Sequence, residues 1–232
     1  MHDNVFFMYQ PKYYNDLLFG YEALLRSNIN GGLVFPDSLI YDGNNNFDYF
    51  VINSVLDSLS KISDEDVIDK IVSINVSAKF MSDQILLSKI NIDIIEKLNL
   101  NIELEILESD KIINFDICNN NITLLNSIGI SVSIDDFGSD YSSIRRLINL
   151  QNISFIKIDK EFIDDIEKHP SLLQSVRILF EFIWSLNFKI LAEGVEKETT
   201  LALLKSLGVE YFQGFYFSKP LRLENEVYRL EF

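Results

Sequence analysis

Short apolar runs rich in β-branched and aromatic residues alternate along this chain with longer stretches of helical spacing. The pattern predicts eight strands and six helices. Strands are expected at Val5–Tyr9, Tyr21–Leu25, Ile71–Val76, Ile102–Leu107, Ser131–Ile134, Phe155–Ile158, Lys189–Ala192 and Tyr211–Phe212. Helices are expected near Asp48–Lys61, Gln84–Leu98, Asn114–Ser127, Tyr141–Asn149, Ser171–Leu186 and Lys197–Leu207.

This alternation indicates repeated β-α units and a parallel sheet. Gly129 and Gly208 follow two of the expected helices, where glycine commonly ends a helix. The segment Asp42–Asn46, DGNNN, is typical of a loop. An open doubly wound sheet would alternate in the same way, so periodicity alone leaves both architectures open. Eight strands in 232 residues without a low-complexity linker favour a closed α/β barrel and one domain over residues 1–232.

Composition narrows the class of protein. Hydrophobic residues make up 47% of the chain, as in a packed globular protein. The formal net charge of −15 disfavours a binding surface for DNA, RNA or an anionic membrane, so a small anionic substrate would need bound cations. One cysteine, Cys118, and two distant histidines, His2 and His169, argue against a disulfide or a histidine-rich metal centre. The N-terminus lacks a secretory signal and no run suits a membrane span, so we expect a cytoplasmic protein.

Polar side chains recur at the downstream ends of the expected strands. In a (β/α) barrel these ends converge on one rim, so residues far apart in sequence would meet there. Clustered carboxylates repel one another and lose hydration, so cations must neutralise them or some must bind protons. Oxygen ligands without histidine or cysteine suit Mg²⁺ or Mn²⁺ better than zinc. The residues concerned are Glu22, Asn75, Glu105, Asp135, Asp136, Lys157, Asp159, Glu193, Glu196 and Gln213.

A simpler explanation exists for each of these residues taken singly. An acid after a strand commonly enters a solvated loop, a lysine there can reach water or pair with an acid, and a loop glutamine usually makes an incidental hydrogen bond. Repetition on strand after strand favours a metal site for the group as a whole. Glu105 lies inside an apolar run and Asp135–Asp136 follows one, so solvation suits these acids least.

Eight short motifs follow one another along nearly the whole chain. They are YQP from Tyr9, EALLR from Glu22, SINVSA from Ser73, ELEILES from Glu103, IDDFGSDYSS from Ile134, IKIDKEF from Ile156, AEGVE from Ala192 and QGFYFSKP from Gln213. In this order and spacing the motifs closely resemble the EAL domain family. The resemblance implies a TIM-like (β/α)8 barrel whose first strand runs antiparallel to the rest. It also implies hydrolysis of cyclic di-GMP to linear pGpG, dependent on Mg²⁺ or Mn²⁺.

The resemblance also implies roles for individual residues. Asp135 would bridge two metal ions, and Glu193 would be a further ligand or the general base that acts on the attacking water. Lys157 would contact that water, and Arg26 would contact a phosphate of the substrate. The implied metal ligands are Glu22, Asn75, Glu105, Asp135, Asp136 and Glu193, and the implied catalytic residues are Glu193, Lys157 and Glu22. The implied substrate-binding shell consists of Gln10, Arg26, Gln213, Asp159 and Glu196.

The chain departs from the family pattern in its loops. The segment Asp136–Ser143 resembles the loop that couples metal binding to dimer contacts, with Glu108 as its anchor, and so allows a homodimer. Within it, Asp140 stands where glycine is usual and Ser139 where threonine is usual. A side chain at a glycine position restricts positive φ, although aspartate tolerates it better than most residues.

Further departures follow the EALLR motif, but none removes an expected metal ligand. Ser27 replaces the usual tryptophan, the usual His-Pro pair is missing, and the Ala-Glu motif expected near Gly43–Asn44 is absent. Three functions therefore stay open. The first is an active phosphodiesterase and the second is an EAL domain that binds cyclic di-GMP without cleaving it. The third, a different metal-dependent barrel enzyme such as an aldolase, would share the acidic rim but not the ordered motifs.

Overall fold

The structure, a computed structural model, describes residues 5–29, 32–34, 46–61, 69–83, 86–107, 111–138 and 144–223. All eight predicted strands are present in these ranges, together with a short additional strand. The strands are β1 (Val5–Tyr14), β2 (Leu17–Ile29), β3 (Gly32–Val34), β4 (Ile71–Val76), β5 (Asn101–Leu107), β6 (Ser131–Phe137), β7 (Phe155–Ile158), β8 (Lys189–Ala192) and β9 (Tyr211–Gln213). The helices are α1 (Asn46–Lys61), α3 (Ile92–Leu98), α4 (Phe115–Ser127), α5 (Ile144–Asn149), α6 (Lys160–Ile163), α7 (Pro170–Ser185) and α8 (Glu198–Ser206), with the 3-10 helices η2 (Phe80–Ser82) and η3 (Leu86–Lys89).

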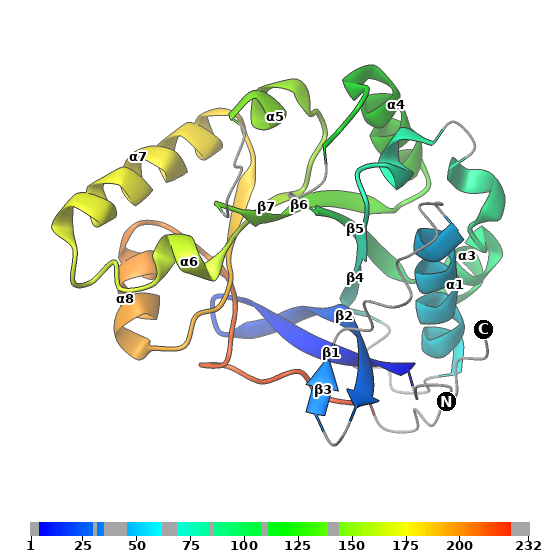
Figure 1. Cartoon of the computed structure of the whole chain (residues 1–232), viewed down its shortest axis with the longest axis horizontal. Helices are drawn as coiled ribbons and strands as arrows, with labels where there is room; N and C mark the ends of the chain where they lie inside the picture. Colours follow the sequence, from blue (N-terminus) through cyan, green and yellow to red (C-terminus); the bar gives the residue numbers. More distant parts are fainter. Residues whose placement is uncertain are drawn as a thin grey trace.

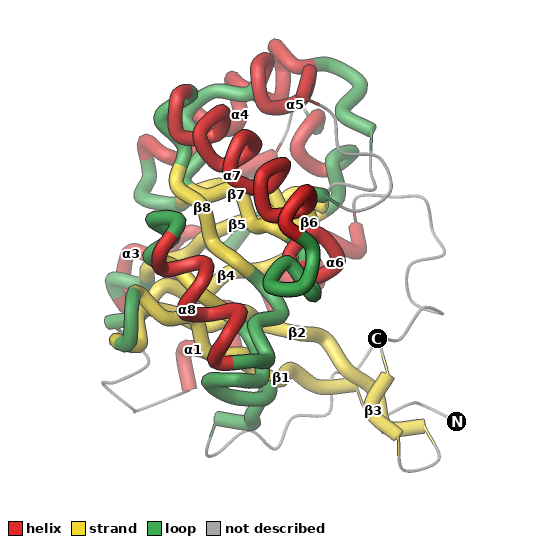
Figure 2. Tube along the Cα trace, turned by 90° about the vertical axis from the view of Figure 1, so that its left-hand side faces the viewer, coloured by secondary structure: helices red, strands yellow, loops and turns green. Residues whose placement is uncertain are grey.

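The strands form one sheet that closes on itself. Their order is β1-β9-β8-β7-β6-β5-β4-β2-β3, and β1 also pairs with β2, which completes an eight-stranded barrel with helices around it (Figure 1). β1 runs antiparallel to both β2 and β9, whereas the other neighbouring barrel strands are parallel. β3 pairs only with β2 and lies with the end of that strand away from the body of the barrel (Figure 2). The predicted TIM-like barrel with an antiparallel first strand is therefore confirmed.

The barrel wall is apolar on its outer face and, toward the downstream ends of the strands, polar on its inner face. Successive side chains of a strand point to opposite faces. On β4, the buried residues Val72, Ile74 and Val76 therefore pack beneath the helices, and Ser73 and Asn75 face the interior. The same alternation on the other strands places the hydrophobic core between the sheet and the helices. Polar side chains are left to fill the inside of the barrel.

The first two strands are both longer than predicted, and the polar interior explains the extension of β1. The prediction ended β1 at Tyr9 because Gln10 and Lys12 interrupt the apolar run, but the strand continues to Tyr14. Lys12 lies in the strand with a side chain that is 0% exposed. Lys12 therefore marks an inward position and does not end the strand.

The predicted single helix over Gln84–Leu98 is wrong. The described part of this segment contains η3, a break, and then α3. The side chain of Asn53 on α1 explains the break, because its amide donates to the carbonyl of Lys89 and its Oδ1 accepts the backbone N–H of Asn91, each at 2.9 Å. These two bonds hold the segment against α1 in place of helix bonds.

The glycines predicted to end two helices are confirmed, whereas one predicted loop is partly wrong. Gly129 and Gly208 lie just beyond α4 and α8 with φ of 83° and 98°, the left-handed conformation expected of helix-ending glycines. The predicted loop Asp42–Asn46 is wrong at its last residue, which begins α1, and its other residues lie outside the described ranges. Residues 141–143, predicted as the start of α5, also lie outside them.

None of the helices in the described ranges has both the length and the apolar character that a bilayer crossing requires.

We predict that Asn121→Ala destabilises the barrel by about 2–3 kcal/mol. Asn121 of α4 is buried, and its amide donates to the carbonyls of Met81 and Asp83 at 3.0 and 2.8 Å, which ties α4 to the segment after β4. The exposed neighbour Asn120 provides a matched control, because Asn120→Ala should change the free energy of unfolding by less than about 0.5 kcal/mol. Urea denaturation measures both values, and equal values would contradict the prediction.

Candidate functional site

A pocket of about 930 Å³ opens at the mouth of the barrel, where the downstream ends of the parallel strands meet. Its walls combine acids from the strand ends with lysines and aromatic rings from the surrounding loops. Ten of the residues predicted from the sequence line it: Gln10, Glu22, Arg26, Asn75, Asp135, Asp136, Asp159, Glu193, Glu196 and Gln213. The predicted residues Glu105 and Lys157 lie deeper, and the predicted loop anchor Glu108 lies outside the described residues.

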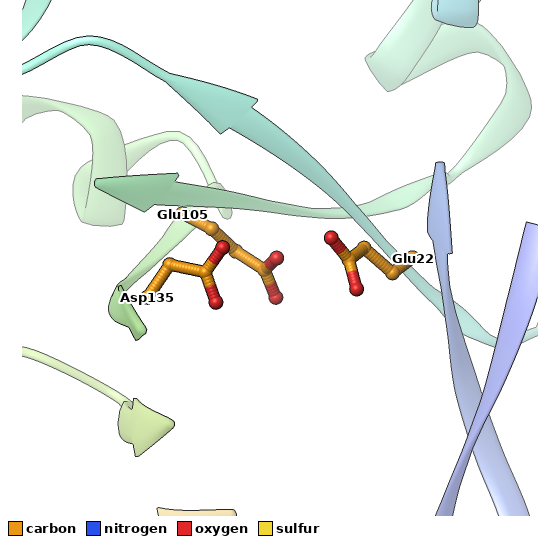
Figure 3. A group of neighbouring side chains, drawn as sticks. All are labelled: Glu22, Glu105 and Asp135. Atoms are coloured by element: carbon orange, nitrogen blue, oxygen red, sulfur yellow. The ribbon is translucent and has the colours of Figure 1, made fainter. Parts of the chain in front are cut away.

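Two groups of carboxylates meet at the base of this pocket. Glu22, Glu105 and Asp135 each offer an oxygen within 4.8 Å of the other two, although they come from β2, β5 and β6, and their carboxylates face one another (Figure 3). Asp135, Asp136 and Glu193 form the second group by the same measure. Asp135 belongs to both groups. Oxygens at these separations can share a small divalent cation, whose ligands lie about 2.1 Å from the metal.

The backbone of β6 explains how two consecutive aspartates reach the same space. In a regular strand, Asp135 and Asp136 would point to opposite faces. The register with β7 shifts between Ile134 and Phe137, so β6 carries one extra residue there, and Asp136 has a φ of 53°. Such a bulge redirects a side chain, and a positive φ is uncommon for a residue other than glycine. This local strain is the kind that accumulates at functional sites.

Lys157 lies at the centre of the acidic groups. Its Nζ is 2.6 Å from Asp135 Oδ1, 2.8 Å from Glu105 Oε2 and 2.9 Å from Glu193 Oε1. A fourth carboxylate oxygen, Oε2 of Glu22, is 3.6 Å away. Burial opposes the charged form of this lysine, but the surrounding carboxylates outweigh burial and raise the pKa of Lys157 well above its ordinary value. The ammonium group therefore stays charged and offsets part of the repulsion among the acids.

Amide side chains hold Glu22 in place. Asn75 Nδ2 donates to one oxygen of Glu22 and Gln213 Nε2 donates to the other, both at 2.7 Å. The carbonyl oxygens Asn75 Oδ1 and Gln213 Oε1 are buried and have no hydrogen-bond partner among the described residues. A buried acceptor without a partner is costly, and a cation would satisfy it. The donor set and these open acceptors together fit a hard metal ion.

Different surroundings give the carboxylates different proton affinities. Burial opposes ionisation of Glu105, but the ammonium groups of Lys12 and Lys157 outweigh it and lower the pKa of Glu105 to about 2. Burial is also the largest effect on Glu193, where with the charges of Glu22 and Glu105 it outweighs Lys157 and raises the pKa to about 8. Burial likewise raises the pKa of Asp135 well above its ordinary value. The site therefore contains both a carboxylate that stays ionised and a carboxyl group that titrates near neutral pH.

The loops after β8 and β9 come very close together beside Glu193. The backbone N–H of Val195 donates to the carbonyl of Gln213 at 3.1 Å, and the N–H of Tyr216 donates to the carbonyl of Val195 at 2.9 Å. A Cβ on Gly214 would lie 2.2 Å from that carbonyl oxygen of Val195. The glycine of the QGF motif therefore permits the contact that fixes this side of the pocket.

The remaining predicted residues lie at the rim with their side chains already engaged. Asp159 caps α6 by accepting the backbone N–H of Glu161 at 2.7 Å, and Glu196 pairs with Lys160 at 2.8 Å. Arg26 donates to the carbonyl of the adjacent residue at 2.8 Å. Gln10 and Arg26 line the pocket, as a substrate-binding role requires.

Sequence reasoning missed some residues of the site. Lys79, Lys111 and Phe215 line the pocket but lie in loops, where a single lysine or aromatic residue gives no signal. Lys12 and Glu103 lie inside the barrel below the mouth. A signal for these two was present, since each is two residues from a predicted site residue on the same strand, Gln10 or Glu105, and such residues share a face.

Of the departures from the family pattern, only Ser27 lies in the described part of the chain. It is a fully buried residue of β2 and pairs with Val5 and Val34. Ser139, Asp140 and the segment Gly43–Asn44 lie outside the described ranges. The predicted effects of these departures on loop geometry and dimerisation therefore stay predictions.

Known proteins are similar to this chain in sequence and in fold. A family model described as EAL domain matches residues 1–220. The cyclic di-GMP phosphodiesterase PdeR of Escherichia coli (strain K12) is 33% identical over 175 residues, which cover 74% of this chain and 26% of that protein. The signaling protein YkoW of Bacillus subtilis (strain 168) is 36% identical over 156 residues, which cover 66% of this chain and 19% of that protein. The chain thus spans about a quarter or less of these two relatives.

A solved structure resembles the fold of this chain over nearly its whole length. The EAL enzyme Bd1971, in a form with cAMP and cyclic di-GMP bound, superimposes with a TM-score of 0.79 at 30% sequence identity. The superposition covers 94% of this chain and 62% of that one. Because the family model and the barrel agree over nearly the whole sequence, the chain belongs to the EAL domain family.

Proposed function

We propose that this protein hydrolyses cyclic di-GMP to linear pGpG with the help of two divalent metal ions, Mg²⁺ or Mn²⁺. The observation that carries the proposal is the pair of carboxylate groups that share Asp135. A carboxylate shared by two oxygen-rich groups would place two ions close together, as two-metal phosphodiester hydrolysis needs. The names of two related proteins support the substrate, since PdeR is a cyclic di-GMP phosphodiesterase and Bd1971 was solved with cyclic di-GMP bound.

The proposal assigns most residues of the mouth to two tasks, substrate binding and metal binding. Arg26 and Gln10 line the open part of the pocket and would bind the substrate, with the guanidinium of Arg26 at a phosphate. Asp159, Glu196 and Gln213 would complete this substrate-binding shell. The metal ligands would be Glu22, Asn75, Glu105, Asp135, Asp136 and Glu193.

The bound ions would supply Lewis-acid charge that polarises the phosphate and makes water a stronger nucleophile. The side chains of the protein would position the ions and the substrate and offset the charge of the clustered carboxylates. Lys157 keeps the carboxylates of Glu105, Asp135 and Glu193 together. Once bound ions neutralise these acids, one of its three N–H groups would become available to donate to the attacking water. Glu193 would act as a metal ligand or accept the proton of that water, and the charge of the bound ions would favour its ionised form. The buried amides of Asn75 and Gln213 would keep Glu22 in one orientation.

We predict that the purified protein converts cyclic di-GMP to pGpG when Mg²⁺ or Mn²⁺ is present. A chelator should abolish turnover and added metal should restore it, because the acidic groups need cations to bind an anionic substrate. Anion-exchange chromatography of the products measures the conversion. Intact cyclic di-GMP under both metals, with binding detected by calorimetry, would instead indicate a binding module without catalysis.

The variant Glu22→Gln should lower kcat/KM for cyclic di-GMP by at least about 100-fold while the barrel stays folded. The substitution removes one negative charge from the first acidic group but keeps the size of the side chain. Glu181→Gln makes the same chemical change at an exposed position on α7 and should leave the rate unaltered. Steady-state kinetics and circular dichroism measure the two effects. A Glu22→Gln variant with the wild-type rate would remove Glu22 from the site.

Chelator-treated protein should lose stability between about pH 5 and pH 8, partly through Glu193. The folded protein holds the Glu193 proton up to a pKa of about 8, whereas the unfolded chain releases it near the ordinary value of 4.5. Between these values the folded state binds more protons, so its advantage is present below pH 4.5 and is lost as the pH rises toward 8. Each kcal/mol lost lowers the Tm of a domain this large by about 2–4 °C.

The variant Glu193→Gln isolates this effect, because glutamine has the same shape and binds no proton. Its Tm in chelator should fall less steeply with pH than that of the wild type. Scanning calorimetry at several pH values gives the two slopes. Parallel curves for the two proteins would show that Glu193 has an ordinary pKa in the folded state.

A further inference from the structure

A buried lysine lies directly below the acidic groups. Lys12 of β1 has a side chain that is 0% exposed, and its Nζ is 2.7 Å from Glu105 Oε1 and 3.2 Å from Glu103 Oε2. Glu103 and Glu105 lie two residues apart on β5, so both point into the barrel. The antiparallel first strand brings the lysine to them from the far side of the interior.

The two oxygens of Glu105 are held by two different lysines. Oε1 accepts from Lys12 at 2.7 Å, and Oε2 accepts from Lys157 at 2.8 Å. Lys157 also contacts Asp135, so Oε2 is the oxygen on the side of the acidic groups. Oε1 is the oxygen that contacts the buried ammonium group of Lys12. Lys12 therefore holds Oε1 of Glu105, and Oε2 is the oxygen beside Lys157, which also contacts Asp135.

Stability alone does not account for a lysine and two glutamates at this depth. Each of the three side chains is at most 1% exposed. Replacing a buried ion pair with apolar residues of similar size is often neutral or stabilising, because both charges lose their hydration in the folded state. The orientation that the lysine imposes on Glu105 offers a functional reason for the cluster.

We propose that Lys12 is a positioning residue, which holds Glu105 Oε1 and so leaves Oε2 as the single oxygen that Glu105 gives to a metal ion. The inference rests on the metal site of the proposed function. A carboxylate that binds a metal through one oxygen is oriented by hydrogen bonds to its other oxygen. Such supporting bonds typically account for about 10–100-fold in metal affinity. Glu103 completes the arrangement by accepting a second hydrogen bond from the same ammonium group.

Charge and position make opposite predictions for this lysine. A positive charge near a cation repels it, so by charge alone the loss of Lys12 would tighten metal binding. By position, the loss would weaken binding, because Glu105 could rotate. The double variant Lys12→Met/Glu103→Met removes an ion pair of opposite charges and so isolates position.

The first test is a Mn²⁺ titration followed by electron paramagnetic resonance, with thermal unfolding to verify that each protein is folded. We expect the double variant to bind Mn²⁺ about 10–100-fold more weakly than the wild type. The control Lys205→Met/Asp16→Asn removes an exposed ion pair of 2.9 Å and should bind Mn²⁺ as the wild type does. A Lys12→Met/Glu103→Met protein that binds Mn²⁺ as tightly as the wild type, or more tightly, would overturn the inference.

The second test needs no variant and so does not depend on whether the double variant folds. In a crystal structure of the wild type with Mn²⁺, Lys12 Nζ should stay within hydrogen-bond distance of Glu105 Oε1, and only Oε2 should contact the ion. Two Glu105 oxygens on one ion, or none, would refute the inference, as would a wild type that binds no Mn²⁺. A protein that binds Mn²⁺ in the expected way but leaves cyclic di-GMP intact would refute only the proposed hydrolysis.

Discussion

Electrostatic repulsion among buried carboxylates is the constraint on which this structure depends. Three parallel strands and the antiparallel hairpin deliver their acids to one mouth, where water is too scarce to screen them. Lys157 inserts an ammonium group among them, and Lys12 supports Glu105 from below. The carboxyl groups that receive less of this positive charge retain their protons more strongly, as the raised pKa values of Asp135 and Glu193 show. Binding of a metal ion at this site would therefore release protons.

The polar lining of the barrel creates this constraint. A barrel of eight strands leaves room for side chains only, and here many of them are charged or small and polar. At the opposite end the rings of Phe19, Phe155 and Tyr211 pack against one another, with centroids 4.8 to 6.1 Å apart. The interior thus changes from aromatic at one end to ionic at the other, and the hydrophobic core that stabilises the fold lies outside the strands.

The sequence pattern predicted those elements correctly whose residue types occur mainly in one kind of secondary structure. The strands Ile71–Val76, Phe155–Ile158 and Lys189–Ala192 have the predicted bounds, because short runs dominated by β-branched and other apolar residues suit buried parallel strands. The shared location of Glu22, Glu105 and Asp135 followed from barrel geometry. Lys12, by contrast, was missed although it lies two residues from Gln10, because a lysine in a strand normally points to water. The break in the helix before Ile92 depends on a side chain from α1. Both features arise from contacts between segments distant in sequence.

The position of β1 also has a consequence for how the protein is made. Lys12 pairs with Gln213 across the seam that closes the barrel, so the first strand of the fold needs the last one as its neighbour. Contacts between such distant residues form slowly, because a long loop must close before they become favourable. During synthesis the early strands leave the ribosome well before β9 is made, so β1 cannot pair with β9 until the end. Closure of the barrel at this seam is therefore among the last contacts that the chain can form.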